Sequence, residues 1–433
     1  MLQKPGQEYW CFPHANVATS IPDPFLPPSF RVFCFTPLVV TLIIGNTHTI
    51  TQNNLQMHPI DLFNPDHYVD VRRPLTEAST LPSWCYTNVE FYQREVETIF
   101  LKHWNFAGRL DQLPNIGDFI TIDFFGESVI VIRGKDDVVR SFANVCRHRS
   151  ARLLNGNGHC RTIVCPYHSW VYGLDGRLIR MKGMEGTVDF NPEENSLREL
   201  KTEIWAGFIF ITFSPEIGPL VEYLGDLAEH FEPYQFSSMR CVRQKRYDLE
   251  CNWKLYIENA MEDYHTATVH RGSIGNQDCV PVDTHGQWNA IHLEAPATIA
   301  VLPEDNTSLP HIEGLYGLAE QGTYFSVIYP ATFFATHQDC MWWLQLLPQA
   351  VDRTTVVIGS CFPESTVERP DFESEVQKYY RRWDKALSED NAVSEWQQRG
   401  LSSSMSRPGR LSDYEPGVHW IANWVLDRVL AAT

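Results

Sequence analysis

The chain has 433 residues, of which 43% are hydrophobic and 20% charged, so it suits two globular domains better than a single compact core. Its formal net charge of -18 leaves no surplus of positive charge for phosphate backbones, which argues against nucleic-acid binding. The eleven cysteines are odd in number and irregularly spaced, unlike a disulfide-rich secreted protein, so we expect a reducing, cytoplasmic location.

The start of the chain differs from the rest. An apolar stretch at residues 30–45 is interrupted by Arg31 and Pro37 and falls short of the ~20 apolar residues that cross a bilayer. No basic region precedes it, and no clear small-residue cleavage site follows, as a signal peptide would require. We therefore expect residues 1–56 to be a disordered or spurious extension before a true start at Met57, with a targeting segment as the alternative, and no membrane association.

The next segment, residues 57–104, is expected to be an arm that ends in a helix, since apolar residues recur at helical spacing over 88–102. Beyond it the pattern changes to short strands separated by turns, including a hairpin turn at 174–176. Residues 105–214 therefore predict an all-β domain. A linker with prolines and a glycine follows at 214–219.

This all-β region contains two pairs of metal-binding residues. Cys146 and His148 form the first pair, and Cys165 and His168 form the second, with sixteen residues between the two pairs. Two thiolates and two imidazoles on one [2Fe–2S] cluster are the Rieske arrangement, which raises its potential to roughly −150 to +300 mV. A zinc site could use the same four ligands, but zinc fingers pair Cys with Cys and His with His. The mixed pairs favour the Rieske cluster.

The second domain is expected over residues 219–430. Residues 252–265 are compatible with a helix, and the stretch from about 283 to 362 is strand-like. Residues 370–400 predict one or two helices, with a proline near their start and a glycine at their end. The expected fold of this domain is therefore α+β, a sheet flanked by helices.

Two histidines in the second domain lie five residues apart and follow several acidic residues. These are His265 and His270, and with one carboxylate they could form the facial triad that binds Fe(II) and leaves positions open for O2 and substrate. Such a pair alone is weak evidence, because histidines at this spacing are more often ordinary core or surface residues. The Cys-His pairs about 100 residues upstream make an iron site the better interpretation.

Both regions resemble one family. The segments CRHRSARLLNGNG, CPYHSWVYGLDG and NWKLYIENAMEDYH resemble the Rieske non-haem iron oxygenases, also called aromatic-ring-hydroxylating oxygenase α subunits. The resemblance implies an all-β Rieske [2Fe–2S] domain, followed by an α+β helix-grip catalytic domain with an antiparallel sheet and a mononuclear Fe(II). Most members have glycine where this chain has Ser150 and Ser169.

The resemblance also assigns roles to single residues. It implies that His265 and His270 are iron ligands and that the third ligand is a carboxylate from a much later helix, for which we expect Asp390, with Glu389 and Asp384 as alternatives. An acid three residues before the first histidine bridges the two metal sites of neighbouring subunits in the family. The expected bridging and catalytic residues are Glu262, with Asp263 as its possible substitute, and Asn259.

The expected function is O2-dependent hydroxylation of a small organic substrate, with an aromatic compound as the leading class. The resemblance implies electrons from NAD(P)H through a reductase, with or without a ferredoxin, and assembly as a homotrimer or with a second subunit as α3β3. A quaternary ammonium substrate such as choline, carnitine or betaine is the alternative, because a glutamate at the position of Glu262 is more familiar in those relatives. A non-catalytic Rieske electron carrier and a zinc-stabilised binding protein are the remaining interpretations.

Overall fold

The computed structural model describes residues 61–307 and 309–431, which belong to one compact unit. The expected extension over residues 1–56 and the alternative start at Met57 lie outside the described residues. Within the described part, none of the helices is both long enough and apolar enough to cross a membrane.

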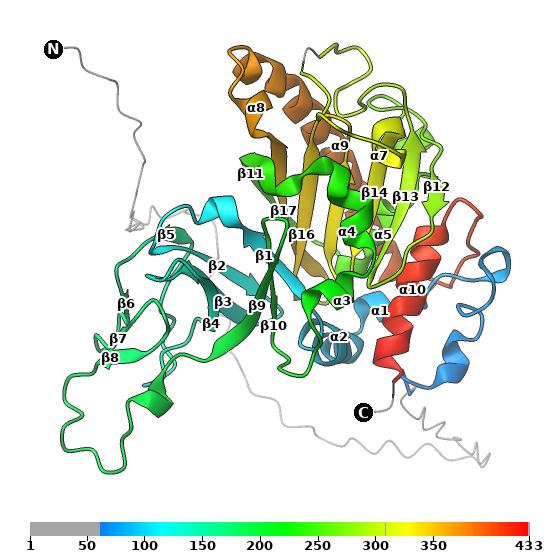
Figure 1. Ribbon diagram of the computed structural model, residues 1–433. Helices are drawn as coiled ribbons and strands as arrows, with labels where there is room; N and C mark the ends of the chain where they lie inside the picture. The colour runs from blue at the N-terminus through cyan, green and yellow to red at the C-terminus, as the bar shows by residue number, and fades with distance from the viewer. Residues whose placement is uncertain (1–60, 308, 432–433) are drawn as a thin grey trace, which may run out of the picture. The chain divides into compact units, whose positions relative to one another are not determined.

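The first half of the described chain is built from strands, as the turn and alternation pattern predicts (Figure 1). One seven-stranded sheet has the order β1-β10-β9-β4-β3-β2-β5, and a three-stranded sheet has the order β6-β7-β8. The predicted hairpin turn is present between β7 and β8, where Gly176 has a φ of +79°. The strands are β1 (Asn105–Arg109), β2 (Asp118–Phe124), β3 (Glu127–Arg133), β4 (Val139–Ala143), β5 (Asn157–His159), β6 (Ile163–Val164), β7 (Val171–Tyr172), β8 (Leu178–Arg180), β9 (Glu199–Trp205) and β10 (Phe208–Thr212).

The second half contains one antiparallel sheet of seven strands in the order β11-β17-β16-β15-β14-β13-β12. The strands predicted between about 283 and 362 are present, but a long irregular segment separates β13 from β14. The α+β architecture with an antiparallel sheet is confirmed. The strands are β11 (Met239–Leu249), β12 (Val280–Val282), β13 (Trp288–Glu294), β14 (Gly322–Ile328), β15 (Thr332–Thr336), β16 (Met341–Ala350) and β17 (Arg353–Pro363).

Helices cover both faces of this sheet (Figure 1). Alternation along β16 sends neighbouring tryptophans to opposite faces. Trp342 stacks on Trp383 of α9 (Phe372–Leu401) with ring centroids 4.2 Å apart, while Trp343 packs edge-on against Phe106 of β1. The face of Trp343 is also covered by α3 (Leu220–Leu224) and α4 (Leu227–Phe231), and the face of Trp342 by α5 (Trp253–Ala260) and α10 (Pro416–Val429).

Two predicted helices end earlier than the sequence pattern suggests. The helix expected over 88–102 is α2 (Val89–Glu95) followed by a single π turn over Val96–Phe100. The helix expected over 252–265 stops at Ala260, and a separate short helix, α6 (Thr266–Val269), follows. Side-chain hydrogen bonds compete with the helix here, because the Glu262 carboxylate accepts from the backbone N–H of His265 at 3.0 Å.

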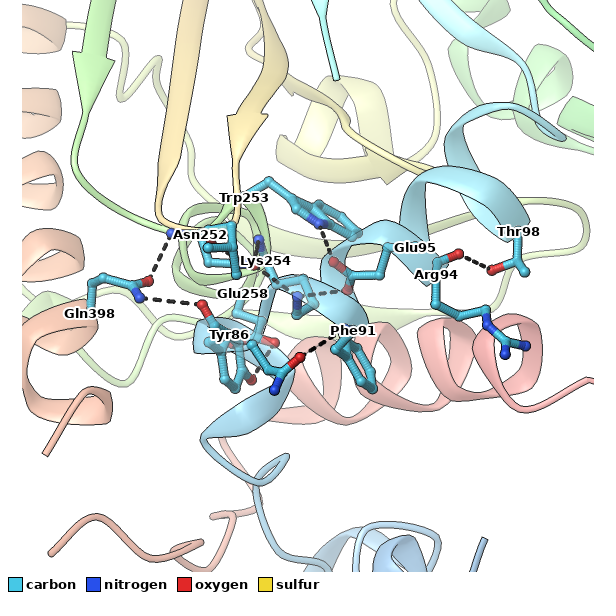
Figure 2. A network of polar contacts seen from close by, with 12 residues as sticks. Tyr86, Phe91, Arg94, Glu95, Thr98, Asn252, Trp253, Lys254, Glu258 and Gln398 are labelled. Atoms are coloured by element: carbon cyan, nitrogen blue, oxygen red, sulfur yellow. Dashed lines mark hydrogen bonds and ion pairs between the residues drawn. The ribbon is translucent and has the colours of Figure 1, made fainter. Parts of the chain in front are cut away.

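A buried polar network joins α2 to α5 and α9 (Figure 2). The Lys254 ammonium donates to Glu95 at 2.6 Å and to the side chain of Asn252 at 2.8 Å, and both members of the Lys254–Glu95 ion pair are fully buried. The backbone N–H of Asn252 in turn donates to Gln398 of α9 at 2.9 Å. Because burying a charge requires a partner, this network fixes α5 against both neighbours.

Candidate functional site

The two Cys-His loops of the first half have the same backbone design. The N–H of Ser150 donates to the carbonyl of Cys146 at 3.0 Å, and the N–H of Ser169 donates to the carbonyl of Cys165 at 3.1 Å. Both serines adopt left-handed φ values, +57° and +59°. This explains why glycine is usual at these places in the family that the sequence resembles, since a Cβ costs roughly 1 kcal/mol in that conformation.

The four potential ligands of these loops converge on one region. Cys146 and Cys165 are buried free thiols, and the rings of His148 and His168 have centroids 4.7 Å apart. His148 stacks on Trp170 with centroids 4.8 Å apart, and its buried Nδ1 has no hydrogen-bond partner among the described residues. An unpartnered buried imidazole nitrogen beside two thiols fits a Rieske [2Fe–2S] cluster.

Tyr172 is a residue of this site that the ligand pattern did not single out. Its hydroxyl oxygen lies 3.3 Å from Cys146 Sγ and accepts from the backbone N–H of Arg147 at 3.0 Å. Because the Tyr172 oxygen already accepts from Arg147, the hydroxyl can donate its own proton to the sulfur of Cys146. Hydrogen bonds to cluster sulfurs raise the reduction potential of iron–sulfur centres, so Tyr172 is placed to tune it.

The second candidate site is a compact group of three side chains from two segments of the chain. The Nε2 atoms of His265 and His270 are 3.3 Å apart, and Asp390 Oδ1 lies 3.6 Å and 3.0 Å from them, respectively. His265 immediately precedes α6, His270 ends it, and Asp390 comes from α9. Asp390 Oδ1 is buried without a well-aligned hydrogen bond among the described residues. Two imidazole nitrogens and a carboxylate oxygen facing one point fit a mononuclear iron.

Acidic partners orient both histidines. His265 Nδ1 lies 2.6 Å from Glu262 Oε1, and His270 Nδ1 lies 2.8 Å from Glu389 Oε2, which also accepts from the hydroxyl of Ser273 at 2.5 Å. Since each Nδ1–H can donate to a carboxylate, each Nε2 keeps its lone pair toward the metal position. Burial lowers the pKa of His270, but the neighbouring carboxylates outweigh it and raise that pKa above its usual value.

The structure distinguishes the acidic residues that the sequence offered as alternatives for the bridging role and for the third iron ligand. Glu262 contacts His265, whereas the Asp263 carboxylate accepts from the backbone N–H of Cys279 and makes no hydrogen bond to either histidine among the described residues. Asp384 forms ion pairs with Arg243 at 2.7 Å and Lys245 at 3.1 Å, away from the histidines. The geometry therefore favours Glu262 over Asp263 as the candidate bridging acid and Asp390 over Asp384 as the candidate ligand.

A small cavity opens beside the two histidines, with about 70 Å³ of space for water-sized molecules. Asn259 lies in its wall, as expected of a site residue, and so does the buried Arg382, which sequence reasoning missed. Of the paired aromatics in the sheet, Phe333 lines the cavity while Phe334 lies on the other face. The other lining residues are Tyr256, Ala260, Glu262, His265, Thr266, His270, Ile274, Gln277, Cys279, Phe325, Leu344, Trp383, Ala386, Leu387 and Asp390.

Comparison with known families matches both halves of the chain. Residues 103–191 match the Rieske [2Fe-2S] domain, and residues 236–431 match the ring hydroxylating alpha subunit (catalytic domain). The glycine betaine monooxygenase oxygenase subunit of Pseudomonas aeruginosa is 28% identical over 396 residues, covering 83% of this chain and 91% of that protein. Choline monooxygenase, chloroplastic, of Beta vulgaris is 27% identical, covering 89% and 85%.

Solved structures give the same family. The quaternary ammonium Rieske monooxygenase CntA in complex with γ-butyrobetaine has a TM-score of 0.70 at 26% identity, covering 83% of this chain and 97% of that one. Naphthalene 1,2-dioxygenase with bound indole has a TM-score of 0.67 at 19% identity, covering 84% and 95%, and shares the fold. The cofactors are thus a Rieske [2Fe–2S] cluster and a mononuclear iron, with O2 as co-substrate. The chain belongs to the Rieske non-haem iron oxygenases and is an oxidoreductase.

Proposed function

We propose that this chain is the oxygenase subunit of a monooxygenase that hydroxylates a small quaternary ammonium compound. This replaces an aromatic substrate, the leading expectation from sequence. The observation that carries the proposal is that relatives matching more than four fifths of the chain are named for glycine betaine and choline. CntA, a quaternary ammonium monooxygenase of similar structure, was solved with γ-butyrobetaine as its substrate. Naphthalene 1,2-dioxygenase is less similar in sequence and supports the fold alone.

The site suits a cationic substrate. Glu262 and Asp390 line the cavity, and Glu389 contacts His270, one of its lining residues. The rings of Phe325, Phe333 and Trp383 contribute to its wall, and aromatic faces attract quaternary ammonium groups. The same rings could enclose an aromatic substrate. The lining of the cavity therefore favours a quaternary ammonium substrate only in combination with the relatives named above.

We assign Cys146, His148, Cys165 and His168 to the cluster, and His265, His270 and Asp390 to the mononuclear iron. When bound, the cluster supplies electrons singly and the iron supplies the place where O2 reacts with substrate. One oxygen atom enters a C–H bond of the substrate, the other leaves as water, and a reductase provides the two electrons from NAD(P)H. Glu262 and Glu389 keep the two imidazoles in the tautomer that binds metal, and the apolar wall limits access of water.

The proposal includes a reductase partner, with or without a ferredoxin, and a closed ring of subunits. Head-to-tail contacts that close give a cyclic trimer, in which Glu262 of one subunit would meet the exposed His168 of the next subunit's cluster. A homotrimer is our first choice, and α3β3 the alternative. The cytoplasmic location also remains a prediction, since the Beta vulgaris relative is described as chloroplastic.

Two measurements test this proposal. Purified anaerobically, the protein should contain about three irons and two acid-labile sulfides per chain. With a reductase, NADH and O2, it should consume NADH with glycine betaine, carnitine or choline and form a hydroxylated or demethylated product. Coupled turnover of aromatic acids, with none of any quaternary ammonium compound, would contradict the proposed substrate class. Colourless protein with stoichiometric zinc would contradict the oxygenase itself.

The Asp390→Ala variant tests the ligand assignment. It should lose the mononuclear iron, so that iron falls to about two per chain, and keep the visible spectrum of the cluster. Asp384→Ala removes a carboxylate of the same helix that is engaged by Arg243 and Lys245, and it should keep all the iron. Iron content unchanged in Asp390→Ala would show that another group completes the site.

A further inference from the structure

Arg382 is a buried cation that forms no ion pair among the described residues, and its guanidinium lies 4.6 Å from the centroid of the Trp383 ring. It is 3% exposed, lines the cavity and sits on α9 eight residues before Asp390. Its Nε donates to the carbonyl of Ile299 at 3.2 Å, but among the described residues neither terminal amino group has a hydrogen bond or an ion pair. Burial lowers the pKa of Arg382 to about 10, so it stays charged at neutral pH. Buried charges are rarely left without a partner.

A second donor on the cavity wall is also unpaired. The hydroxyl of Tyr256, a residue of α5 that is 2% exposed, has no hydrogen-bond partner among the described residues. The indole N–H of Trp383, another wall residue, has none either. A buried donor that lacks an acceptor is costly, and a ligand in this cavity that reached the Tyr256 hydroxyl would supply one.

Arg382 and Asp390 line the cavity from different turns of α9. Arg382, Trp383, Ala386 and Asp390 recur at the spacing that places them on one face of α9. Arg382 and Asp390 are separated by roughly 12 Å along the helix axis, from 1.5 Å per residue. Arg382 therefore enters the cavity wall from a turn of α9 about two turns away from that of Asp390. A ligand that reaches from Arg382 toward His265 and His270 would therefore place an anionic group at the arginine.

We infer that Arg382 and Tyr256 form an anion subsite that binds the carboxylate of a zwitterionic quaternary ammonium substrate. The inference rests on the proposed function and sharpens it, since it selects betaines over choline-type cations. The planar guanidinium can donate two parallel hydrogen bonds to a carboxylate, and the Tyr256 hydroxyl can donate a third. With its carboxylate at Arg382, the substrate can place its trimethylammonium group among the aromatic rings of the wall, nearer the two histidines.

Binding to the anaerobic, oxidised holoenzyme tests this subsite without turnover. Calorimetry should show that γ-butyrobetaine or glycine betaine binds more tightly than choline, which lacks the carboxylate. In Arg382→Gln the affinity for the betaine should fall roughly 10- to 100-fold, the effect of losing a hydrogen-bonded charge pair. Choline binding should stay the same or tighten, because a positive charge has been removed. Arg382→Lys should recover part of the loss.

Arg381→Gln is the matched control, with the same change of charge one residue away. Arg381 is exposed and paired with Asp305 at 2.6 Å, so its loss should leave betaine binding within about twofold of wild type. Should Arg382→Gln fail to fold, Tyr256→Phe removes one donor and conserves volume, and it should weaken betaine binding several-fold without weakening choline.

The outcomes separate the two proposals. Equal betaine affinity in wild type and Arg382→Gln, or in wild type and Tyr256→Phe if only that variant folds, would overturn the anion subsite. Tight choline binding with no preference for betaines would also overturn the anion subsite. It would still agree with a quaternary ammonium substrate. If the protein bound an aromatic carboxylate in a way that depends on Arg382, and bound no betaine, the proposed substrate class would be wrong. The anion subsite would still be supported.

Discussion

The two nitrogens of each candidate ligand histidine have different tasks. Nε2 of His265 and of His270 faces the proposed iron, while Nδ1 is held by Glu262 or Glu389. The two carboxylates lie at similar distances from the histidines that they contact, but they belong to different parts of the chain. Glu389 is also bonded to Ser273 and is adjacent to Asp390 in α9, so its contacts are all local to the site. Glu262 precedes α6 and is our candidate for contact with a neighbouring subunit.

This difference gives a prediction for two matched variants. Glu389→Gln should weaken retention of the mononuclear iron by roughly 10- to 100-fold, because partners of ligand histidines set their orientation. Glu262→Gln should keep both metals and slow electron transfer from the reduced cluster in single-turnover stopped-flow measurements. Iron analysis and the rate of cluster oxidation with substrate and O2 check both variants. A wild-type rate in Glu262→Gln would contradict the bridging role.

Among the elements, α5 and α9 build the site together. Helix α9 is continuous over Phe372–Leu401, so it can carry Arg382 and Asp390 at a fixed separation. Helix α5 must instead stop at Ala260, because the chain has to turn before both histidines can face α9. The buried network around Lys254 holds the start of α5 in place (Figure 2).

The same network predicts a pH dependence of stability. One lysine, Lys254, faces two buried acids and is bonded to Glu95, while Glu258 accepts from the Tyr86 hydroxyl at 2.8 Å. Burial raises the pKa of Glu258 to about 8. The folded state therefore keeps a proton that the unfolded chain releases above its own pKa near 4.5. The resulting stabilisation is complete below that value and is lost as the pH rises through about 8.

Glu258→Gln should remove this pH dependence of stability, because glutamine has nearly the same shape as glutamate and does not titrate. From about pH 5 to pH 8, wild type should lose on the order of 2–4 kcal/mol relative to the variant. Thermal unfolding midpoints measured across that range check the difference. Glu222→Gln, a change at an exposed acid of α3, serves as control. Parallel pH profiles of wild type and Glu258→Gln would show that Glu258 is ionised in the folded protein.

At the scale of the whole molecule, the proposed ring predicts complementation between inactive chains. Asp390→Ala should keep the cluster and lack the iron, whereas Cys165→Ala should lack the cluster and keep the iron. If electrons cross between subunits, co-expressed mixed trimers regain roughly a quarter of wild-type turnover, because half of the donors and half of the acceptors are intact at each contact. Turnover is measured on purified mixed oligomers, with each variant alone as control. No recovery would place electron transfer within one chain.

The sequence by itself determined the family, both cofactors and the two-domain α+β architecture, because ligand types and short-range periodicity are local properties. It also selected Asp390, but only through the resemblance, since 120 residues separate it from His270. Tertiary structure decided what local patterns cannot encode. Packing of α9 beside His270 and β11 assigned Glu389 to His270 and Asp384 to Arg243, while Glu262 contacts the nearby His265. The sheet faces separated Phe333 from Phe334, and burial without a partner singled out Arg382, because unsatisfied charge arises only after distant segments have packed.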